Sequence, residues 1–222
     1  MLKTLAFDVY GTLIDTHGVV GELRNMVGDR AEAFSTTWRE KQLEYAFRRG
    51  LMQNYADFSV CTKQALLYTD ALYQTSLNDQ QKEALMALYS ELPAYEDVIP
   101  ALQQLKGAGH KLYAFSNGSR AAVQRLLGNA HILSYFRDVV SVEDLKSFKP
   151  NPAVYSHFLR CAGAVTSNSW LISSNPFDVI GARSAGMSAA WVQRKKEQVF
   201  DPWEIEPTIT VPSLSSLVHE HL

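Results

Sequence analysis

The stretch Leu5-Ala6-Phe7-Asp8-Val9-Tyr10-Gly11-Thr12 predicts a short buried strand that ends at a carboxylate. Three apolar residues form the strand, and Gly11 and Thr12 are sufficient for the turn that follows it. The carboxylate of Asp8 is therefore not needed for the turn. Ligands of an open parallel sheet bind beyond the carboxyl ends of its strands, so Asp8 is a candidate for chemistry.

Four later segments repeat this pattern of a short apolar run followed by turn residues. They cover residues 111–115, 138–141, 170–172 and 189–192. Strands that alternate with helix-like segments are typical of a parallel sheet with helices on both faces. The fold class predicted is α/β, with a Rossmann-like doubly wound parallel sheet as its core.

Residues 16–95 have a different character, because they are helical in period and rich in aromatic side chains. They lie between the first and the second apolar run, so they predict a helical cap inserted after the first strand. We therefore expect a core domain formed by residues 1–15 and 96–222, and a cap domain formed by residues 16–95. Such a cap would cover the carboxyl end of the first strand.

Composition excludes several classes of protein. The 222 residues are 46% hydrophobic and 20% charged, with a formal net charge of −2. These values favour a packed core and give no sign of a nucleic acid or a membrane as partner. No apolar run reaches the length of a membrane span, and Cys61 and Cys161 are the only cysteines. Two distant thiols predict a reduced protein in the cytoplasm.

Polar residues follow several of the apolar runs, where one edge of the predicted sheet would bring them together. Each alone has an ordinary explanation as a helix cap or a turn residue. Their shared position is what indicates a site. The residues after the later runs are Ser116, Asn117, Lys149, Ser173, Ser174, Asn175 and Asp178.

Lys149 is the cation of this set. It precedes Pro150, which favours extended backbone, and Asn151 and Pro152 fit the N-cap and the first position of a helix. Lys149 should therefore project from the loop before that helix. Beside Asp8 it would favour the ionised carboxylate, and an ionised, partly desolvated carboxylate can act as a nucleophile.

Arg39 is a second unusual residue, because a predicted helix over residues 37–49 places it on an apolar face. It shares that face with Leu43 and with Ala46 or Phe47. A guanidinium that turns inward needs an anion or a path to water. Arg39 is therefore a candidate for binding an anionic group.

The motifs together resemble the haloacid dehalogenase superfamily and, more narrowly, the L-2-haloacid dehalogenases. The resemblance covers essentially the whole chain, including the inserted segment. It is carried by Phe7-Asp8-Val9-Tyr10-Gly11-Thr12-Leu13, Ser116-Asn117-Gly118, Lys149-Pro150, Ser173-Ser174-Asn175-Pro176-Phe177-Asp178, Trp38-Arg39, Gln42-Leu43-Glu44-Tyr45 and Tyr55-Ala56-Asp57-Phe58.

Two positions favour the narrower assignment. Phosphatases of the superfamily carry a second Asp two residues after the nucleophile, where this chain has Tyr10. They also carry an acidic magnesium ligand in the last motif, where this chain has Ser173 and Ser174. Mg²⁺ prefers carboxylate and phosphate oxygens, so these differences argue against magnesium-assisted phosphoryl transfer.

The resemblance implies a metal-independent hydrolase without a cofactor that converts an L-2-haloalkanoate to the 2-hydroxy acid of inverted configuration. Asp8 would displace the halide from C2, and a water molecule would then hydrolyse the aspartyl ester. The expected partners are this small 2-haloacid, the halide product and a second copy of the chain, which would form a homodimer through the insert.

The resemblance also distributes roles among the residues. Thr12 would fix Asp8, and Asp178, held by Lys149, Ser173 and Asn175, would activate the water. Arg39, Asn117 and Phe177 would stabilise the leaving halide, and Lys149, Ser116 and the main-chain N–H groups of Val9 and Tyr10 would offset the substrate carboxylate. Tyr10, Leu43 and Phe58 would form the apolar wall. Tyr155, grouped with the substrate-binding residues, is expected beside Lys149 or Asp178.

Three alternatives remain open on the sequence. A related hydrolase could open a strained ring next to a carboxylate by the same attack from Asp8. A magnesium-dependent phosphatase is disfavoured by Tyr10 and Ser174. A non-catalytic binding protein on the same fold is disfavoured by the joint presence of Asp8, Arg39, Asn117, Lys149 and Asp178.

Overall fold

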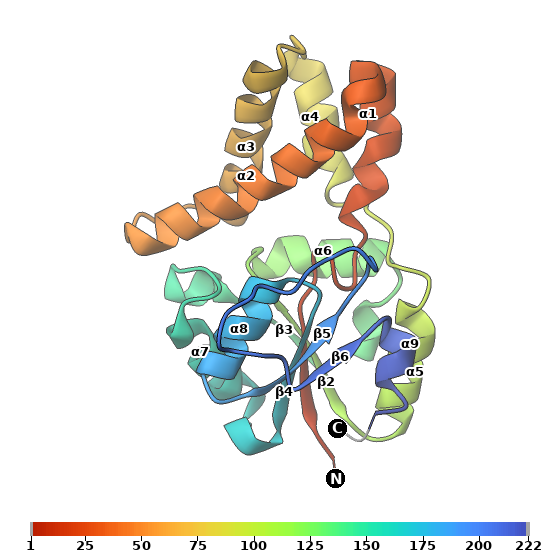
Figure 1. The fold of residues 1–222 in the computed structure, drawn as a ribbon, viewed down its shortest axis with the longest axis vertical. Helices are drawn as coiled ribbons and strands as arrows, with labels where there is room; N and C mark the ends of the chain where they lie inside the picture. The colour runs from red at the N-terminus through yellow and green to blue at the C-terminus, as the bar shows by residue number, and fades with distance from the viewer. Residues whose placement is uncertain (1, 221–222) are drawn as a thin grey trace.

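The computed structural model describes residues 2–220 and contains one parallel sheet (Figure 1). Its strand order is β3-β2-β1-β4-β5-β6, and every neighbouring pair is parallel. The chain runs outward from β1 to β3 and then returns to the other side of β1. The strands are β1 (Thr4–Phe7), β2 (Lys111–Ser116), β3 (Asp138–Ser141), β4 (Ser169–Ser173), β5 (Ser188–Val192) and β6 (Ile209–Val211).

Helices connect and cover these strands. The α-helices are α1 (Val20–Val27), α2 (Ala31–Leu51), α3 (Phe58–Tyr73), α4 (Asp79–Leu88), α5 (Val98–Gly107), α6 (Arg120–Asn129), α7 (Pro152–Ala162), α8 (Pro176–Ser184) and α9 (Leu214–Leu217). Short 3-10 helices are η1 (Thr16–Val19), η2 (Gly28–Arg30), η3 (Leu133–Tyr135), η4 (Val142–Leu145) and η5 (Thr166–Asn168).

Alternation along β1 divides the core into two layers. Leu5 and Phe7 point to one face and pack with residues of α5, α6 and α9, whereas Ala6 points to the other face, toward α7 and α8. All four residues of β1 are buried, because helices cover both faces of this central strand. The sheet is therefore doubly wound, as the sequence predicts.

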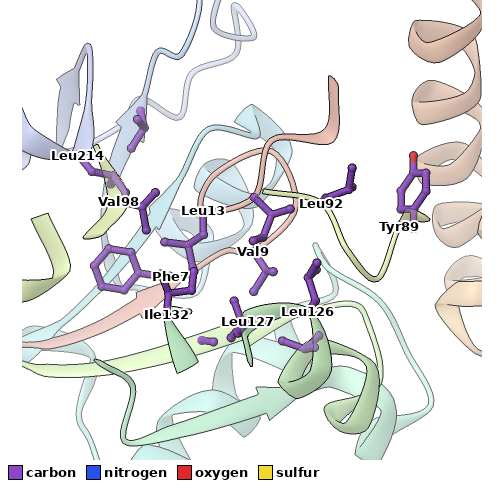
Figure 2. Close-up of a cluster of buried hydrophobic side chains, with 14 of the residues drawn as sticks. Phe7, Val9, Leu13, Tyr89, Leu92, Val98, Leu126, Leu127, Ile132 and Leu214 are labelled. Carbon is purple, nitrogen blue, oxygen red and sulfur yellow. The ribbon is translucent and has the colours of Figure 1, made fainter. Parts of the chain in front are cut away.

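The cap consists of the helices α1 to α4, which lie beyond the carboxyl end of the sheet, away from the two chain termini (Figure 1). The two segments that connect it to the core run side by side. Ile14 forms an antiparallel bridge with Ala94, and the main-chain N–H of Asp15 donates to the carbonyl of Pro93. Figure 2 shows Leu92 and Tyr89 extending from the core cluster around Phe7 toward the cap.

The predicted fold class is confirmed, with two differences in its elements. The helix expected over residues 37–49 is longer and spans Ala31–Leu51, because Ala31 and Phe34 extend its buried side. The last strand, β6, was not predicted; its three residues are too few for a pattern, and it forms by pairing with β5 at the sheet edge. Within residues 2–220, no helix has the length and apolar character to cross a membrane.

Candidate active site

Asp8 lies at the centre of the site, directly after β1 and beside the end of β4. Its main-chain N–H donates to the carbonyl of Ile172, which continues the ladder one residue beyond the strand. The residue is only 7% exposed. This position is the switch point of the sheet, where the chain changes its winding direction and where such folds bind ligands. Gly11 turns the chain back at a φ of +86°, which glycine adopts without strain.

The two oxygens of Asp8 have different surroundings. Oδ2 accepts three hydrogen bonds, from Thr12 Oγ1 at 2.9 Å, Ser173 Oγ at 3.1 Å and Asn175 Nδ2 at 2.6 Å. Oδ1 accepts one, from Lys149 Nζ at 3.2 Å. The donors fix the rotamer of the carboxylate, and Oδ1 retains lone pairs that are free to react.

Lys149 links both acidic residues of the site. Its ammonium is 3.2 Å from Asp8 Oδ1 and 2.7 Å from Asp178 Oδ2, and it also donates to the carbonyl of Phe115 at 2.8 Å. The residue is 1% exposed. A buried ammonium needs such partners, and here they place two carboxylates on opposite sides of one cation. Asn151 caps α7 and Pro152 opens it, as the sequence predicts.

Asp178 is completely buried in the first turn of α8. Burial raises its pKa to about 6, Lys149 opposes this rise, and the charge of Asp8 adds to it. Tyr155 donates its hydroxyl to Asp178 Oδ1 at 2.7 Å. Burial and the neighbouring Asp178 raise the pKa of Tyr155 well above its usual value, so Tyr155 stays a hydrogen-bond donor.

Two sequence-based role assignments need correction. Ser173 and Asn175 were expected to hold Asp178, but their side chains donate to Asp8 instead. Both follow β4, which pairs directly with β1, and this pairing brings them to Asp8. Tyr155 was grouped with the substrate-binding residues, but its hydroxyl is occupied by Asp178 and its side chain is fully buried against Phe115.

The structure also separates Ser173 from Ser174, which the sequence could not do. Ser174 makes no hydrogen bond to Asp8. Its hydroxyl donates to the carbonyl of Gly11 at 2.6 Å, and its main-chain N–H donates to Thr12 Oγ1 at 2.8 Å. Ser174 therefore ties the last motif to the loop after β1, whereas Ser173 contacts the carboxylate itself.

Ser116 and Asn117 approach Lys149 from the end of β2. The side-chain oxygen of Asn117 accepts from the main-chain N–H of Lys149 at 2.9 Å, which leaves its amide nitrogen as a donor. Ser116 Oγ accepts from the N–H of Gly118 at 3.1 Å. In the part of the chain that the structure describes, the main-chain N–H groups of Val9 and Tyr10 have no hydrogen-bond acceptor.

Arg39 reaches this site from the cap. Its guanidinium donates to the carbonyl of Tyr10 at 3.3 Å and to Gln42 Oε1 at 2.6 Å. The same carbonyl of Tyr10 accepts from Asn175, which also holds Asp8. Across residues 2–220, no carboxylate lies within 4 Å of the Arg39 guanidinium. Its charge is therefore available to an anionic ligand.

Gln42 is a functional candidate that the sequence reasoning missed. It is fully buried, accepts from Arg39 and donates to Thr62 Oγ1 at 2.5 Å. Thr62 in turn donates to the carbonyl of Phe58. The signal was present as a polar residue three positions after Arg39, on the same side of the helix.

Tyr10 and Phe58 line one cavity of about 140 Å³ with Gln42, Tyr89 and Gly118. The rings of Tyr10 and Phe58 are 5.9 Å apart. Burial raises the pKa of Tyr10 and brings that of Tyr89 to about 12, so both phenols are neutral. Leu43 is half-buried on α2 and does not line this cavity.

Phe177 lies in a second hollow, of about 560 Å³, between the cap and the core. Its ring meets that of Phe47 edge to face at 5.0 Å. Lys149 is at the base of this hollow, whereas Arg39 and Asn117 do not line it. The structure therefore brings Asp8, Thr12, Lys149, Ser173, Asn175 and Asp178 together. It does not place Phe177 in one cavity with Arg39 and Asn117, as the sequence-based halide site would require.

The positions that distinguish phosphatases hold no carboxylate here. Tyr10 points its ring into the aromatic cavity, and Ser174 is occupied by Gly11 and Thr12. Among residues 2–220, no group of three or more His, Cys, Asp or Glu side chains is arranged to hold a metal ion. The donor set around Asp8 consists of an ammonium, hydroxyls and an amide, which suits the stabilisation of a carboxylate.

Comparisons with known proteins agree with this geometry. A family model described as a haloacid dehalogenase-like hydrolase matches residues 2–186. An (S)-2-haloacid dehalogenase from Pseudomonas putida is 34% identical over 216 residues, which are 97% of this chain and 95% of that protein.

Two solved structures extend this similarity to the whole fold. A dehalogenase with an intermediate complex has a TM-score of 0.92 and 34% identity, covering 97% of this chain and 95% of its own. An L-2-haloacid dehalogenase from Xanthobacter autotrophicus with covalently bound chloropropionic acid has a TM-score of 0.90 and 31% identity, covering 98% and 97%. The protein described here belongs to the haloacid dehalogenase superfamily and, within it, to the L-2-haloacid dehalogenase family.

Proposed function

We propose that the protein is an (S)-2-haloacid dehalogenase that acts through Asp8 as nucleophile. The observation that carries this proposal is the surroundings of Asp8, which has three donors on Oδ2, a single ammonium contact on Oδ1, and no second carboxylate at the positions of Tyr10 and Ser174. Curated relatives with this activity match the chain over nearly its full length.

In the first step, Oδ1 of Asp8 attacks C2 of the L-2-haloalkanoate in line with the carbon–halogen bond. A C–O bond forms, the halide leaves with the bonding electrons, and C2 inverts. Arg39 and the amide nitrogen of Asn117 are donors for the departing halide, and the free N–H groups of Val9 and Tyr10 are donors for the substrate carboxylate. Phe177 lines the second hollow, which Arg39 and Asn117 do not line, so we assign it no contact with this halide.

In the second step, a water molecule attacks the Asp8 carbonyl carbon of the ester. Asp178 takes the proton from the water and passes it to the hydroxyl oxygen of the 2-hydroxy acid as that group leaves. Lys149 and Tyr155 hold Asp178 in place for this transfer. Neither step as written uses a metal ion or a cofactor, and the ammonium of Lys149 contacts both carboxylates.

Measured chloride release from L-2-chloropropionate in the presence of EDTA tests this function. The D-enantiomer, and p-nitrophenyl phosphate with Mg²⁺, serve as parallel substrates. Chloride from the L form alone supports the proposal, whereas phosphate release that depends on Mg²⁺ without chloride would assign a phosphatase. No product in either assay would favour the ring-opening hydrolase or a binding role.

Asp8→Asn removes the nucleophile while keeping nearly the same shape, so we expect turnover to be abolished. A single turnover of the unmodified enzyme in ¹⁸O water should place the label in Asp8, and mass spectrometry of the active-site peptide measures this. Label that appears directly in the 2-hydroxy acid would mean that water, and not Asp8, attacks C2.

We also propose the homodimer, with the contact formed by the cap. The helix α3, which belongs to the cap (Figure 1), exposes the large apolar side chains of Val60, Leu67, Tyr68 and Leu72. The free thiol of Cys161 is exposed and fits a reducing compartment, so we place the protein in the cytoplasm. We also propose that the boundaries between the core domain and the cap domain lie after residues 15 and 95.

A further inference from the structure

Arg194 lies two residues after the end of β5, and its guanidinium contacts two other segments of the chain. It donates from Nη1 to both carboxylate oxygens of Asp97, at 2.8 Å and 2.7 Å, and from Nη2 to the main-chain carbonyl of Thr12 at 2.5 Å. Its planar group lies 4.1 Å from the ring centre of Tyr95. The side chain is only 10% exposed.

The contact with Thr12 connects Arg194 to the nucleophile. Thr12 donates its hydroxyl to Asp8 Oδ2 at 2.9 Å, and the same oxygen of Thr12 accepts from the N–H of Ser174. Arg194 thus holds the main chain of the residue whose side chain orients the carboxylate. Only the carbonyl of Thr12 is used, so its hydroxyl remains free to serve Asp8.

Arg194 is itself clamped, which a positioning residue requires. Asp97 Oδ2 also accepts from the main-chain N–H of Leu214 at 2.7 Å, which ties the ion pair to the start of α9. The N–H of Tyr95 donates to the carbonyl of Leu13 at 3.1 Å. The guanidinium therefore joins the end of β5, the second connection to the cap and the catalytic loop.

We propose that Arg194 is a positioning residue for ester formation: it acts through Thr12 to hold Asp8 in the orientation from which it attacks C2. This inference rests on the proposed function. A displacement of a reacting group by about 1 Å can slow a reaction by about a hundredfold. A residue that reaches Asp8 only through Thr12, by two hydrogen bonds, can therefore affect the rate. Lys at this position keeps the charge but lacks the planar fork that binds Asp97 and Thr12 together.

The test is a single-turnover measurement of chloride release with enzyme in excess over L-2-chloropropionate. For Arg194→Lys we expect the rate of chloride release to fall about tenfold or more. KM, measured separately in the steady state, should change less than about threefold, because the contacts of Arg194 are with Asp97, Tyr95 and Thr12. Arg183→Lys is the matched control. Arg183 also donates to two main-chain carbonyls, of Glu206 and Met187, but contacts no residue of the catalytic loop, so its variant should release chloride at the original rate.

A structural role alone would give a different result. If Arg194→Lys lowered the melting temperature but released chloride at an unchanged rate well below that temperature, the inference would be overturned. If Arg194→Lys does not fold, Asp97→Asn replaces it in the test. This variant keeps the guanidinium of Arg194 but removes the charge of the carboxylate that holds it. We expect about a threefold slower release, and an unchanged rate would again contradict the inference. If the unmodified enzyme released no chloride, the proposed function itself would fail.

Discussion

At the scale of single residues, the site is built around one buried cation between two carboxylates of different character. Asp8 is held by hydroxyl and amide donors, whereas Asp178 is buried with its pKa raised to about 6. Two carboxyl groups with such different surroundings suit different tasks, one as nucleophile and one as base. Lys149 contacts both, and beside Asp178 its ammonium opposes the rise in pKa that burial causes.

The raised pKa of Asp178 predicts the pH dependence of ester hydrolysis. The base must be ionised, so the rate should fall about tenfold per pH unit below about pH 6. Tyr155→Phe removes a donor that lowers this pKa, so the fall should move to a pH higher by about half a unit to one unit. Rates of 2-hydroxy acid release between pH 4.5 and 8 measure both effects.

If the fall in rate occurred at the same pH in Tyr155→Phe as in the unmodified enzyme, the assignment of Asp178 as the base would be contradicted. Tyr113→Phe is the control, because Tyr113 packs against Phe158 and does not touch Asp178.

The stability of the protein also depends on the ionisation of Asp178. Burial makes the folded chain bind this proton more tightly than the unfolded chain, so the contribution of Asp178 to the free energy of unfolding decreases as the pH rises from about 4 to about 6.

Arg39→Lys tests the leaving-group role of the guanidinium. Lysine keeps the charge but cannot donate to Tyr10 and Gln42 with one planar group. We expect chloride release to slow by about a hundredfold, since loss of one donor to a developing charge has about this cost. Arg49→Lys, on the same helix but bonded to Asn54 and Gln64, is the control. An unchanged rate in Arg39→Lys would exclude Arg39 from the halide site.

At the scale of elements, the close approach of α7 to α8 determines the geometry of Asp178. Tyr155 on α7 reaches over Gly181 on α8 to donate to Asp178. A Cβ at position 181 would overlap Tyr155 Oη and lie 2.7 Å from the Cβ of Pro150. Glycine is therefore required by the space between the helices, because nothing larger leaves room for the hydroxyl.

Gly181→Ala should consequently lower both stability and ester hydrolysis. Overpacking of a buried contact costs about 1–3 kcal/mol, and displacement of Tyr155 removes a donor from Asp178. Urea unfolding measures the first effect, and the rate of 2-hydroxy acid release measures the second. Gly107→Ala is the control, because an added Cβ there meets no atom within 4 Å. Wild-type stability of Gly181→Ala would show that the two helices can separate without cost.

At the scale of the whole molecule, the active site lies between two units that the chain connects twice. The core supplies Asp8, Lys149 and Asp178, and the cap supplies Arg39 and Phe58. The apolar side chains of the cap are not all buried within the chain, because α3 exposes four large ones to solvent. Several large apolar side chains exposed on one helix are typical of a contact with another protein.

The proposed homodimer predicts that a charge on this face separates the subunits. Leu67→Glu should shift the sedimentation coefficient from a dimer to a monomer at micromolar concentration, because an unpaired carboxylate would be buried in the contact. Val165→Glu is the control, since Val165 is 63% exposed and lies before β4, far along the chain from the cap. A dimer that persists in Leu67→Glu would place the contact elsewhere, and a monomeric unmodified protein would contradict the dimer itself.

The sequence by itself determined the parallel sheet, the inserted helical segment and the polar residues of the site, because short apolar runs and the polar residues after them are local patterns. These patterns placed Lys149 beside Asp8, and the family resemblance placed Thr12 there. It could not decide which carboxylate Ser173 and Asn175 contact, because that depends on β4 pairing with β1 rather than on spacing along the chain.

Only the tertiary structure revealed the roles of Gln42 and Arg194, and only it showed that Tyr155, expected beside Lys149 or Asp178, donates to Asp178. Gln42 contacts Arg39 and Thr62, Tyr155 contacts Asp178, and Arg194 contacts Asp97 and Thr12. Most of these partners are distant in sequence and lie on other elements. A hydrogen bond of this kind depends on how helices and strands pack, and packing has no local signature in the chain. The residue types that perform the chemistry are therefore readable from the sequence, whereas the contacts that orient them exist only in the folded protein.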